Sequence, residues 1–521
     1  VTGSLLPRGN FASNAPITTI GSEQFEISNA VNIESLLNTL PQILAGSDRT
    51  STFGLGWATA DLRGLGENRT LTLLDGKRVV PTFADGGTVD LNFIPPGIVD
   101  RVEVLTGGAS TTYGSDAMAG VINLITKTNQ EGLELVVAAE MTGQSDAEIL
   151  NVASTWGTSF DNDRGHFMIH LDATERRSLN YHERDFSTIF KTDFFDQGTS
   201  QGLRDFRFGA AKNGSLQFFG LGEDVMFTPV GGDVTPFDRS VDGYDPTENL
   251  ELQIPQDRLA LFSKTNWQGD TFEIRFQAHI AESKLDRTAP TVSSGFWIGP
   301  QAFTVENNPF LSDSTVQRLS YTPFVQFTGS DVNGNGIPET ARAVIGKTFS
   351  ELGPSRWDQI YSLRQFEIGF TRDLTDRWNL DGYLNHGEIK MDWTATPAIV
   401  RARLAQSLLI DVSDTTGQTC LDPTNGCVPV NIYGLDSISP AALDFISTEV
   451  LVTNKSKITT ANLLLTGNTA GFFEMPGGVG PVGVAAGLEY ISRSQEIVTD
   501  DRAMTGELFY WGGFPTSADE T

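Results

Sequence analysis

The chain has 521 residues, of which 65 are acidic and 36 basic, giving a formal net charge of -29. A nucleic-acid partner would require a basic face, so this balance argues against one. No run of about 18 apolar residues occurs, so the sequence predicts no membrane-spanning helix. Membrane-spanning β-strands are not excluded, because each needs only about 9–11 residues of alternating apolar and polar character.

The first 130 residues or so predict a small mixed α/β domain. The stretch "SNAVNIESLLNTLPQI" predicts a helix that ends at Pro41. Its helical spacing is carried by Ile33, Leu36, Leu37 and Leu40. Next, "NRTLTLLDGKRVV" alternates around Asp75-Gly76, which is a β-hairpin signature. Two further strands are predicted in "VDRVEVL" and "GVINLITKT".

A glycine-rich segment, "TGGASTTYGSDAMAG", joins these last two strands. A phosphate loop would need a lysine and a following helix, and both are missing from this pattern. We expect its glycines to allow close backbone approach and unusual dihedral angles. These are Gly107, Gly108, Gly114 and Gly120. Tyr113 is the large side chain of the segment and is expected to anchor it.

After residue 130, long alternating strands are predicted instead. In "DTFEIRFQAHIAESK", Phe272, Ile274 and Phe276 share one face, and Gln277 and His279 share the other. Three similar segments cover residues 164–176, 364–374 and 480–494. A soluble sandwich alternates in the same way. Strands of 10 to 15 residues, charged polar faces, and long loops alternating with tight turns favour a transmembrane barrel instead.

Three segments in this order resemble the plug domain of TonB-dependent outer-membrane receptors: "NIESLLNTLPQI", "DLRGLGENRTLTLLDGKRV" and "VDRVEVLTGGASTTYGSDAMAGVINLITKT". The resemblance implies a mixed α/β plug domain followed by an antiparallel transmembrane β-barrel, with 22 strands in the family. We expect an N-terminal extended segment at 1–22, the plug at 23–129 and the barrel at 130–521. About ten or eleven strands are predicted after residue 130, so we expect the barrel to be incomplete at the C-terminus, with about its first half present.

The resemblance also suggests functional residues in the plug. Arg63 is similar to the family's plug arginine, which implies a plug–barrel latch between Arg63 and the inward-facing Glu489; the alternative is that Arg63 caps a turn. The remaining plug-motif residues are Gly64, Asp75, Gly76, Glu103, Gly107, Gly108, Tyr113, Gly114 and Gly120. "VTGS" at Val1 resembles the residues that directly follow the TonB box. The TonB box itself would pair with TonB by strand addition.

Cys420 and Cys427 lie in "TCLDPTNGCVP", where Pro423 and Gly426 favour a turn. We expect a local disulfide formed in an oxidising compartment; the alternative is two free thiols.

The segment "DVNGNGIPE" is spaced like the first half of a calcium loop, in which alternate oxygens converge on one hard cation. The ligands would be Asp331, Asn333, Asn335 and Glu339. Arg342 stands at the twelfth position, where an EF-hand has its bidentate glutamate. A structural Ca²⁺ is therefore one interpretation, and an exposed Asn/Gly-rich turn is the other.

No nucleophile elbow, zinc-protease motif or paired Cys/His ligand set occurs, so we expect neither an enzyme nor a catalytic cofactor. The resemblance implies energised import of a scarce substrate, such as a ferric siderophore, cobalamin, a glycan or a peptide, across the outer membrane of a Gram-negative bacterium. The expected partners are TonB of the TonB–ExbB–ExbD complex, outer-membrane lipid and the substrate. Substrate contacts are expected at residues 82–88, 285–357 and 395–440. The alternatives are a passive porin or structural barrel, and a secreted soluble β-rich binding module.

Overall fold

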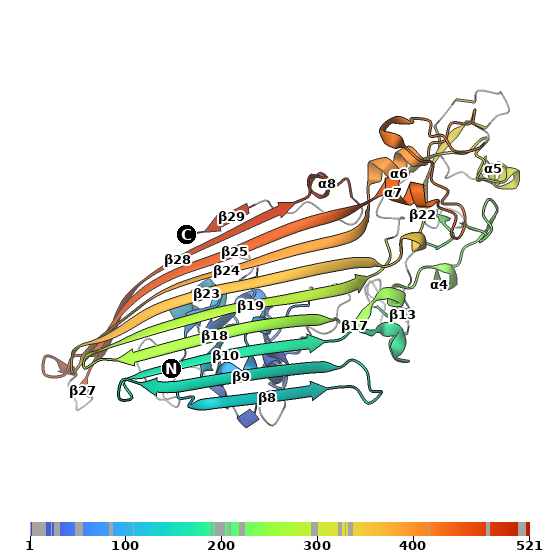
Figure 1. Ribbon diagram of the computed structural model, residues 1–521. Coiled ribbons are helices and arrows are strands. Elements are labelled where there is room, and N and C mark those ends of the chain that lie inside the picture. Colours follow the sequence, from blue (N-terminus) through green and yellow to red (C-terminus); the bar gives the residue numbers. More distant parts are fainter. Residues whose placement is uncertain are drawn as a thin grey trace.

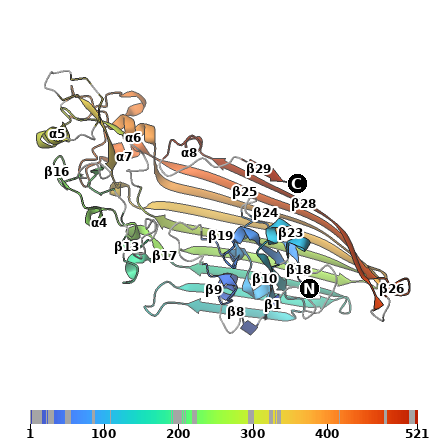
Figure 2. The ribbon, with the colours of Figure 1, turned by 180° about the vertical axis from the view of Figure 1, so that it is seen from behind.

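The fold is built on a five-stranded and a ten-stranded β-sheet, and a third, six-stranded sheet lies in the long connections described below (Figure 1). The computed structural model describes residues 2, 17–21, 23–24, 32–46, 56–82, 87–107, 109–188, 191–192, 204–205, 207, 210–217, 225–292, 301–320, 326–328, 330–331, 337–414, 416–475, 480–508 and 517–520. A five-stranded sheet organises the N-terminal domain, and a ten-stranded sheet, called the wall below, follows it. The N-terminal domain packs against one face of the wall (Figure 2).

The N-terminal sheet has the order β1-β6-β7-β4-β5. Its strands are β1 (Ile17–Gly21), β4 (Thr70–Leu74), β5 (Lys77–Arg78), β6 (Val99–Thr106) and β7 (Gly120–Thr126). The pair β4–β7 is parallel and the other pairs are antiparallel. The predicted hairpin and the two predicted strands are therefore present, with Asp75 and Gly76 between β4 and β5.

The predicted helix is α2 (Ile33–Leu37), which is shorter than its apolar pattern suggested. Asn32 caps it, and its side-chain oxygen accepts a hydrogen bond from the Ser35 amide at 2.9 Å. The domain's core reaches the wall through Met168 and Phe262. The domain's smaller elements are β2 (Ile43–Leu44), β3 (Asp61–Leu62), η2 (Glu67–Arg69), η3 (Leu91–Phe93), η4 (Pro96–Ile98), α3 (Ser110–Tyr113) and η5 (Ser115–Ala117).

The wall is antiparallel throughout and has the order β29-β28-β25-β24-β23-β19-β18-β10-β9-β8. Its strands are β8 (Gly132–Glu140), β9 (Ile149–Phe160), β10 (Gly165–Arg176), β18 (Gln256–Gln268), β19 (Phe272–Ala289), β23 (Ser355–Thr375), β24 (Trp378–Ile399), β25 (Ser447–Asn468), β28 (Gly483–Thr499) and β29 (Ser517–Glu520). The described strands form an open, curved, barrel-like sheet, and β8 and β29 are its edges.

In the wall the apolar side chains are exposed and the polar side chains are buried, the reverse of a sheet in a soluble protein. On β19, Ile274, Phe276 and Ile280 are 45%, 43% and 41% exposed, whereas Gln277 and His279 are 8% and 3% exposed. An apolar face of this extent is stable when lipid covers it, while the N-terminal domain covers the polar face. The alternation read from the sequence is therefore that of a membrane wall. Among the helices in the described ranges, none has the length and apolarity needed to cross a membrane.

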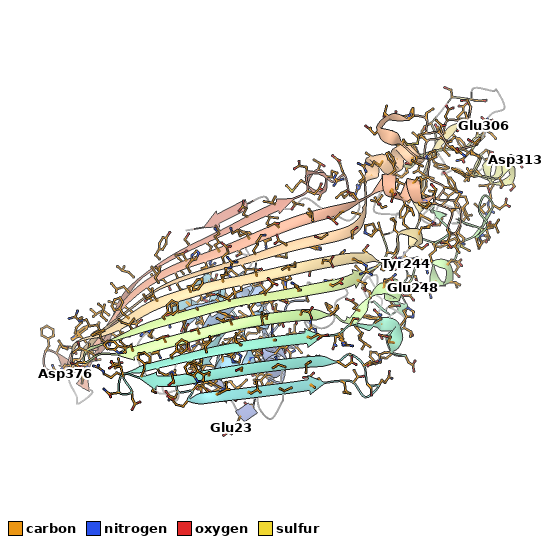
Figure 3. All side chains as sticks on the ribbon, in the orientation of Figure 1. Glu23, Tyr244, Glu248, Glu306, Asp313 and Asp376 are labelled. Carbon is orange, nitrogen blue, oxygen red and sulfur yellow. A yellow bond between two sulfur atoms is a disulfide. The ribbon has the colours of Figure 1, made fainter. Side chains whose placement is uncertain are left out.

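The two ends of the wall differ. Short turns connect β9 to β10, β18 to β19 and β23 to β24. A longer turn with a small hairpin, β26 (Glu474–Met475) and β27 (Gly480–Pro481), connects β25 to β28. Three long connections, residues 177–255, 290–354 and 400–446, leave the opposite end. Asp376 in a short turn and Glu306 in a long connection mark these two ends in Figure 3.

The long connections fold together into what we call the loop unit, which has its own apolar core. Its main sheet has the order β16-β15-β14-β22-β20, with β21 also paired to β22. The elements of this sheet and its helices are β14 (Ser215–Gln217), β15 (Val225–Phe227), β16 (Val234–Pro236), β20 (Gln301–Thr304), β21 (Gln326–Phe327), β22 (Thr340–Gly346), α5 (Asp313–Ser320), α6 (Arg401–Ser407) and α7 (Pro440–Ile446). The sequence pattern had indicated only long polar loops here, because strands this short are stabilised by pairing between connections.

Smaller elements complete the described chain. They are β11 (Leu179–Asn180), η6 (Tyr181–Glu183), β12 (Lys191–Thr192), β13 (Arg204–Asp205), α4 (Arg239–Asp242), η7 (Pro246–Asn249), β17 (Glu251–Gln253), η9 (Ser350–Leu352), η10 (Thr424–Gly426) and α8 (Asp501–Met504).

Candidate functional site

The candidate site is the contact between the N-terminal domain and the wall, centred on four consecutive residues, Asp75, Gly76, Lys77 and Arg78. We call them the docking turn. Asp75 and Gly76 have φ angles of 49° and 80°, a left-handed conformation that an Asp-Gly pair adopts readily in tight hairpins. This turn places three charged side chains in succession at the tip of the β4–β5 hairpin, next to the wall.

Asp75 is the most fully bonded member of the docking turn. Its Oδ2 accepts hydrogen bonds from Lys264 Nζ in the wall at 3.0 Å and from Thr126 Oγ1 at 2.7 Å, and Gln277 of the wall donates to the same oxygen. Burial raises the pKa of Asp75, but nearby Lys264 and Lys77 and the bonds from Thr126 outweigh burial and hold that pKa below its usual value. The carboxylate is therefore charged at neutral pH.

Of the other two charged side chains of the turn, Lys77 reaches the wall directly and Arg78 reaches it through Asp116. Lys77 Nζ lies 3.1 Å from Glu367 Oε1 on β23. Arg78 Nη1 lies 2.5 Å from Asp116, and Arg493 of β28 bonds to that same carboxylate. Burial raises the pKa of Asp116, yet the two guanidinium groups hold it below its usual value. Asp116 thus bridges the N-terminal domain and the wall.

Side chains of the wall also hold backbone carbonyls of the N-terminal domain. Arg78, Thr82, Asn92 and Phe93 supply these carbonyl oxygens. The donors are Gln365 and Asn385 to Arg78 (3.0 and 2.9 Å), Asn454 to Thr82 (3.2 Å), Arg258 to Asn92 (2.9 Å) and His279 to Phe93 (2.8 Å). In the described residues, no strand ladder joins the two sheets. The contact can therefore be broken without unpairing a strand.

The structure does not form the predicted Arg63–Glu489 pair. Arg63 is exposed, with a φ of 61°, in the turn that follows β3. Glu489 lies on the same face of β28 as Arg493 but is exposed, so the N-terminal domain does not cover it. The arginine contact between domain and wall is made by Arg493 to Asp116 instead.

The predicted motif glycines take different roles. Gly120 has a φ of 147°, and a Cβ there would lie 2.2 Å from the carbonyl oxygen of Leu105, so this position requires glycine. Gly64, Gly107 and Gly114 also have positive φ angles. Gly108 lies outside the described residues.

The two other predicted plug-motif residues both accept hydrogen bonds. The carbonyl of Tyr113 accepts a bond from Arg78 Nη2 at 2.5 Å, and its ring packs against a small apolar cluster. The carboxylate of Glu103 accepts a bond from the Thr2 hydroxyl at 2.6 Å.

Three further predicted features lie away from the docking turn. Cys420 and Cys427 form a disulfide in the loop unit, with Cα atoms 6.1 Å apart. Asp331 and Glu339 are described, but Asn333 and Asn335 are not. Within the described ranges no group of three or more His, Cys, Asp or Glu residues is arranged to hold a metal ion, and calcium stays a prediction. Most of the N-terminal extended segment, including Val1, is also outside the described residues.

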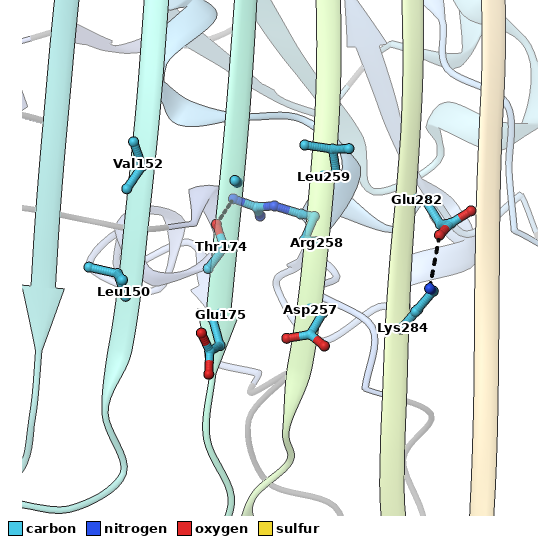
Figure 4. A pocket seen from close by; sticks show the side chains of 10 residues that line it. Leu150, Val152, Thr174, Glu175, Asp257, Arg258, Leu259, Glu282 and Lys284 are labelled. Carbon is cyan, nitrogen blue, oxygen red and sulfur yellow. Dashed lines mark hydrogen bonds and ion pairs between the residues drawn. The ribbon is translucent and has the colours of Figure 1, made fainter.

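The outward face of the wall becomes charged near the long connections (Figure 4). Glu175, Asp257 and Lys284 lie in register on three neighbouring strands. The adjacent row toward the short turns carries Val152 and Leu259, which are exposed. This change from apolar to charged side chains marks one edge of the apolar face.

Comparison with known proteins gives the family of the N-terminal domain. Residues 10–121 match the family model described as the TonB-dependent Receptor Plug Domain. The N-terminal domain is therefore a TonB-dependent receptor plug domain. We call it the plug from here on, and the docking turn is the centre of its contact with the wall. The resemblance read from the three sequence segments is thereby confirmed.

Two curated relatives match part of this chain. The chain is 36% identical over 136 residues to the vitamin B12 transporter BtuB of Vibrio vulnificus, a match covering 26% of this chain and 21% of the transporter. It is 36% identical over 125 residues to the iron-regulated outer membrane virulence protein of Vibrio cholerae, covering 23% and 18% of the two chains. The matches thus span about a fifth of each relative.

Among solved structures, BauA, the ferric preacinetobactin receptor of Acinetobacter baumannii, aligns with 97% of this chain and 50% of its own length. The TM-score is 0.47 and the sequence identity is 13%.

Sequence reasoning identified the Asp75-Gly76 turn but missed its wall partners Lys264, Glu367 and Arg493. A signal for one of them was available, because Glu367 lies between the outward-facing apolar residues Phe366 and Ile368 on its strand. Strand parity marks such residues as inward. It does not indicate which inward residue meets the plug, since that depends on the register of several strands.

Proposed function

We propose that this receptor imports a scarce small molecule across the outer membrane of a Gram-negative bacterium, with TonB supplying the energy for plug movement. The observation that carries the proposal is the way the plug is held. Ion pairs and side-chain hydrogen bonds fix it to the wall, and no strand ladder does so in the described residues. A domain held in this way seals the wall at rest and can be displaced without unfolding the barrel strands.

The loop unit supports a binding role at the outer end. Its described parts have a core of their own, and it stands at the end of the wall opposite the short turns. Substrate would bind between this unit and the nearby plug segments that include Thr82 and Asn92. Binding would favour the plug conformation that TonB engages, through a difference in affinity between two states.

The named relatives suggest the substrate class. One is a vitamin B12 transporter and the other an iron-regulated outer-membrane protein. A ferric siderophore or cobalamin is therefore the substrate class that we favour, ahead of glycans and peptides.

Neither alternative function accounts for the observed contacts. A passive porin would not need a plug fixed by three separate groups of charges at the docking turn. A secreted soluble module would not expose Ile274, Phe276 and Ile280 together on one sheet face.

Uptake by the full-length receptor tests the proposal. Cells that express it would be given radiolabelled cobalamin or a panel of labelled ferric siderophores, with TonB present or deleted. We expect accumulation of one of these compounds, and we expect deletion of TonB to abolish it. Accumulation at the same rate without TonB would indicate a passive pore, and no accumulation of any compound would contradict the proposed substrate class.

A further inference from the structure

A directional chain of hydrogen bonds connects the N-terminal segment to the docking turn. The hydroxyl of Thr2 donates to Glu103 Oε2 at 2.6 Å. The side-chain amide of Asn123 donates to Thr2 Oγ1 at 2.9 Å. The backbone amide of Gly76 donates to Asn123 Oδ1 at 2.9 Å. Residue 2 is thereby connected, through two side chains of the plug sheet, to the turn that carries Asp75.

The chemistry of these groups determines which group donates and which accepts at each step of the hydrogen-bond chain. An ionised carboxylate only accepts hydrogen bonds, so Glu103 uses the one hydroxyl proton of Thr2. The Thr2 oxygen must then accept from Asn123, whose NH₂ group is turned toward it. The carbonyl oxygen of the same amide is consequently turned toward Gly76. Loss of the Thr2 hydroxyl removes the group that orients Asn123.

All three side chains that form the hydrogen-bond chain are buried. Thr2, Glu103 and Asn123 are 3%, 4% and 5% exposed. Water therefore cannot readily replace Thr2 while the plug keeps its present packing, and a buried polar group without a partner is strongly unfavourable. Removal of Thr2 is expected to affect Asn123 and then Gly76, rather than being absorbed by solvent.

The hydrogen-bond chain ends at Gly76, beside the contact between the plug and the wall. Gly76 follows Asp75, whose Oδ2 bonds to Lys264, and whose Oδ1 accepts from the Thr126 amide at 2.9 Å. The turn is thus held from both sides, by Asn123 at Gly76 and by Lys264 and Thr126 at Asp75.

We propose that Asn123 is a positioning residue that couples the docking of Thr2 to the docking of Asp75 on the wall. When Thr2 occupies its position, the turn is held in the geometry that engages Lys264. When Thr2 is withdrawn, the amide of Asn123 loses its orientation and the turn loosens from the wall. This gives a pulled N-terminal segment a short route to the plug–wall contact, a consequence that rests on the proposed function.

Hydrogen exchange in the full-length receptor tests the coupling. The Gly76 and Thr126 amides are measured in the wild type, in Thr2→Val, which keeps the shape and loses the hydroxyl, and in Thr2→Ser, which keeps the hydroxyl. We expect Thr2→Val to speed exchange at Gly76 by about tenfold, the effect of losing one hydrogen bond of ordinary net strength. A smaller increase is expected at Thr126, and Thr2→Ser should restore protection at both.

Thr18→Val is the matched control, because Thr18 is an exposed threonine of β1 in the same plug sheet. It should leave exchange at Gly76 unchanged, and the amides of α2 provide an internal reference for an intact plug. If α2 stays protected and Thr2→Val leaves Gly76 unchanged, or if Thr18→Val has an equal effect, the coupling is refuted. If α2 also loses protection in Thr2→Val, Thr2 supports the plug as a whole and the specific coupling is refuted as well. The readout involves neither uptake nor TonB, so a failure here is distinguishable from a failure of the proposed function.

Discussion

Asp75 of the plug and Lys264 of the wall form an ion pair of 3.0 Å whose side chains are only 11% and 10% exposed. Because so little water surrounds the two charges, each is stabilised mainly by its partner. Removing one partner from a buried pair is strongly destabilising, whereas a pair that separates into water regains its hydration. The contact is thus strong while closed, and opening requires the turn to move far enough for both charges to reach solvent.

Lys264→Met should weaken plug docking by about 3–5 kcal/mol, because it leaves Asp75 charged and buried beside Gln277 and Thr126. A urea titration of the reconstituted receptor, with hydrogen exchange read in plug peptides, measures the change. Lys284→Met is the matched control, since Lys284 is an exposed lysine on the outward face of the wall. It should change plug stability by less than about 0.5 kcal/mol. Equal effects of the two substitutions would show that Lys264 has no special role.

The Asp116 bridge should respond unequally to the loss of its members. Asp116→Asn leaves Arg78 and Arg493 facing each other without the charge between them, so plug docking should weaken strongly. Arg493→Gln keeps the Arg78–Asp116 pair within the plug, and a smaller loss is expected. The same urea titration compares the two variants. A larger loss for Arg493→Gln would contradict the central position assigned to Asp116.

Plug docking should also depend on pH in a defined direction. Burial raises the pKa values of Asp75, Asp116 and Glu103, but their cationic and hydrogen-bonding partners outweigh burial and hold all three below their usual values. A depressed carboxyl pKa gives stability that is present above the unfolded-state value and is lost as the pH falls through the folded value. The stability difference between wild type and Asp75→Asn should therefore be constant from pH 7 to 5 and shrink below about pH 4. A difference that already disappears between pH 7 and 5 would assign the effect to another group.

Lys347 should be the main polar support of the loop unit. Its buried ammonium donates to the carbonyl oxygens of Lys212 and Gly434 at 2.6 and 3.0 Å and pairs with Glu351 at 2.9 Å, so it joins all three long connections. Lys347→Met should destabilise the loop unit by about 3 kcal/mol, since Glu351 and two carbonyls lose their partner. Hydrogen exchange should rise in α6 and α7 and stay unchanged in β18 and β19. Lys212→Met, at the exposed pair with Glu248, is the control and should have little effect.

Much of the fold was predictable because local patterns determine it. The Asp75-Gly76 pair specifies a tight turn by its backbone preference, and the alternation around Gln277 and His279 specifies which residues of β19 face inward. The loop unit was not predictable in this way. Leu216 and Ile345 are buried opposite each other in β14 and β22, although about 130 residues separate them and each strand is short. No local period in either segment indicates that pairing.

The site was less predictable than the fold for a related reason. Arg63 looked like the docking arginine because of its motif, but its turn leaves it in solvent. Arg493 took that role through the register of β28, which depends on β25 and the strands beyond it. Thr2 carried no sequence signal at all, because a single threonine becomes informative only when Glu103 and Asn123 are known to surround it.

The most direct test of plug release is to fix the docking turn to the wall and measure transport. Asp75→Cys and Lys264→Cys would be combined in the full-length receptor and joined by a short bismaleimide, with the two single-cysteine variants given the same reagent as controls. We expect the cross-linked receptor to bind substrate at the outer face but no longer to accumulate it inside the cell, while the uncross-linked double variant, which lacks both charges, keeps TonB-dependent uptake. Uptake by the cross-linked receptor at the rate of the uncross-linked double variant would contradict this mechanism, because Asp75 would then not need to leave Lys264 for the path to open.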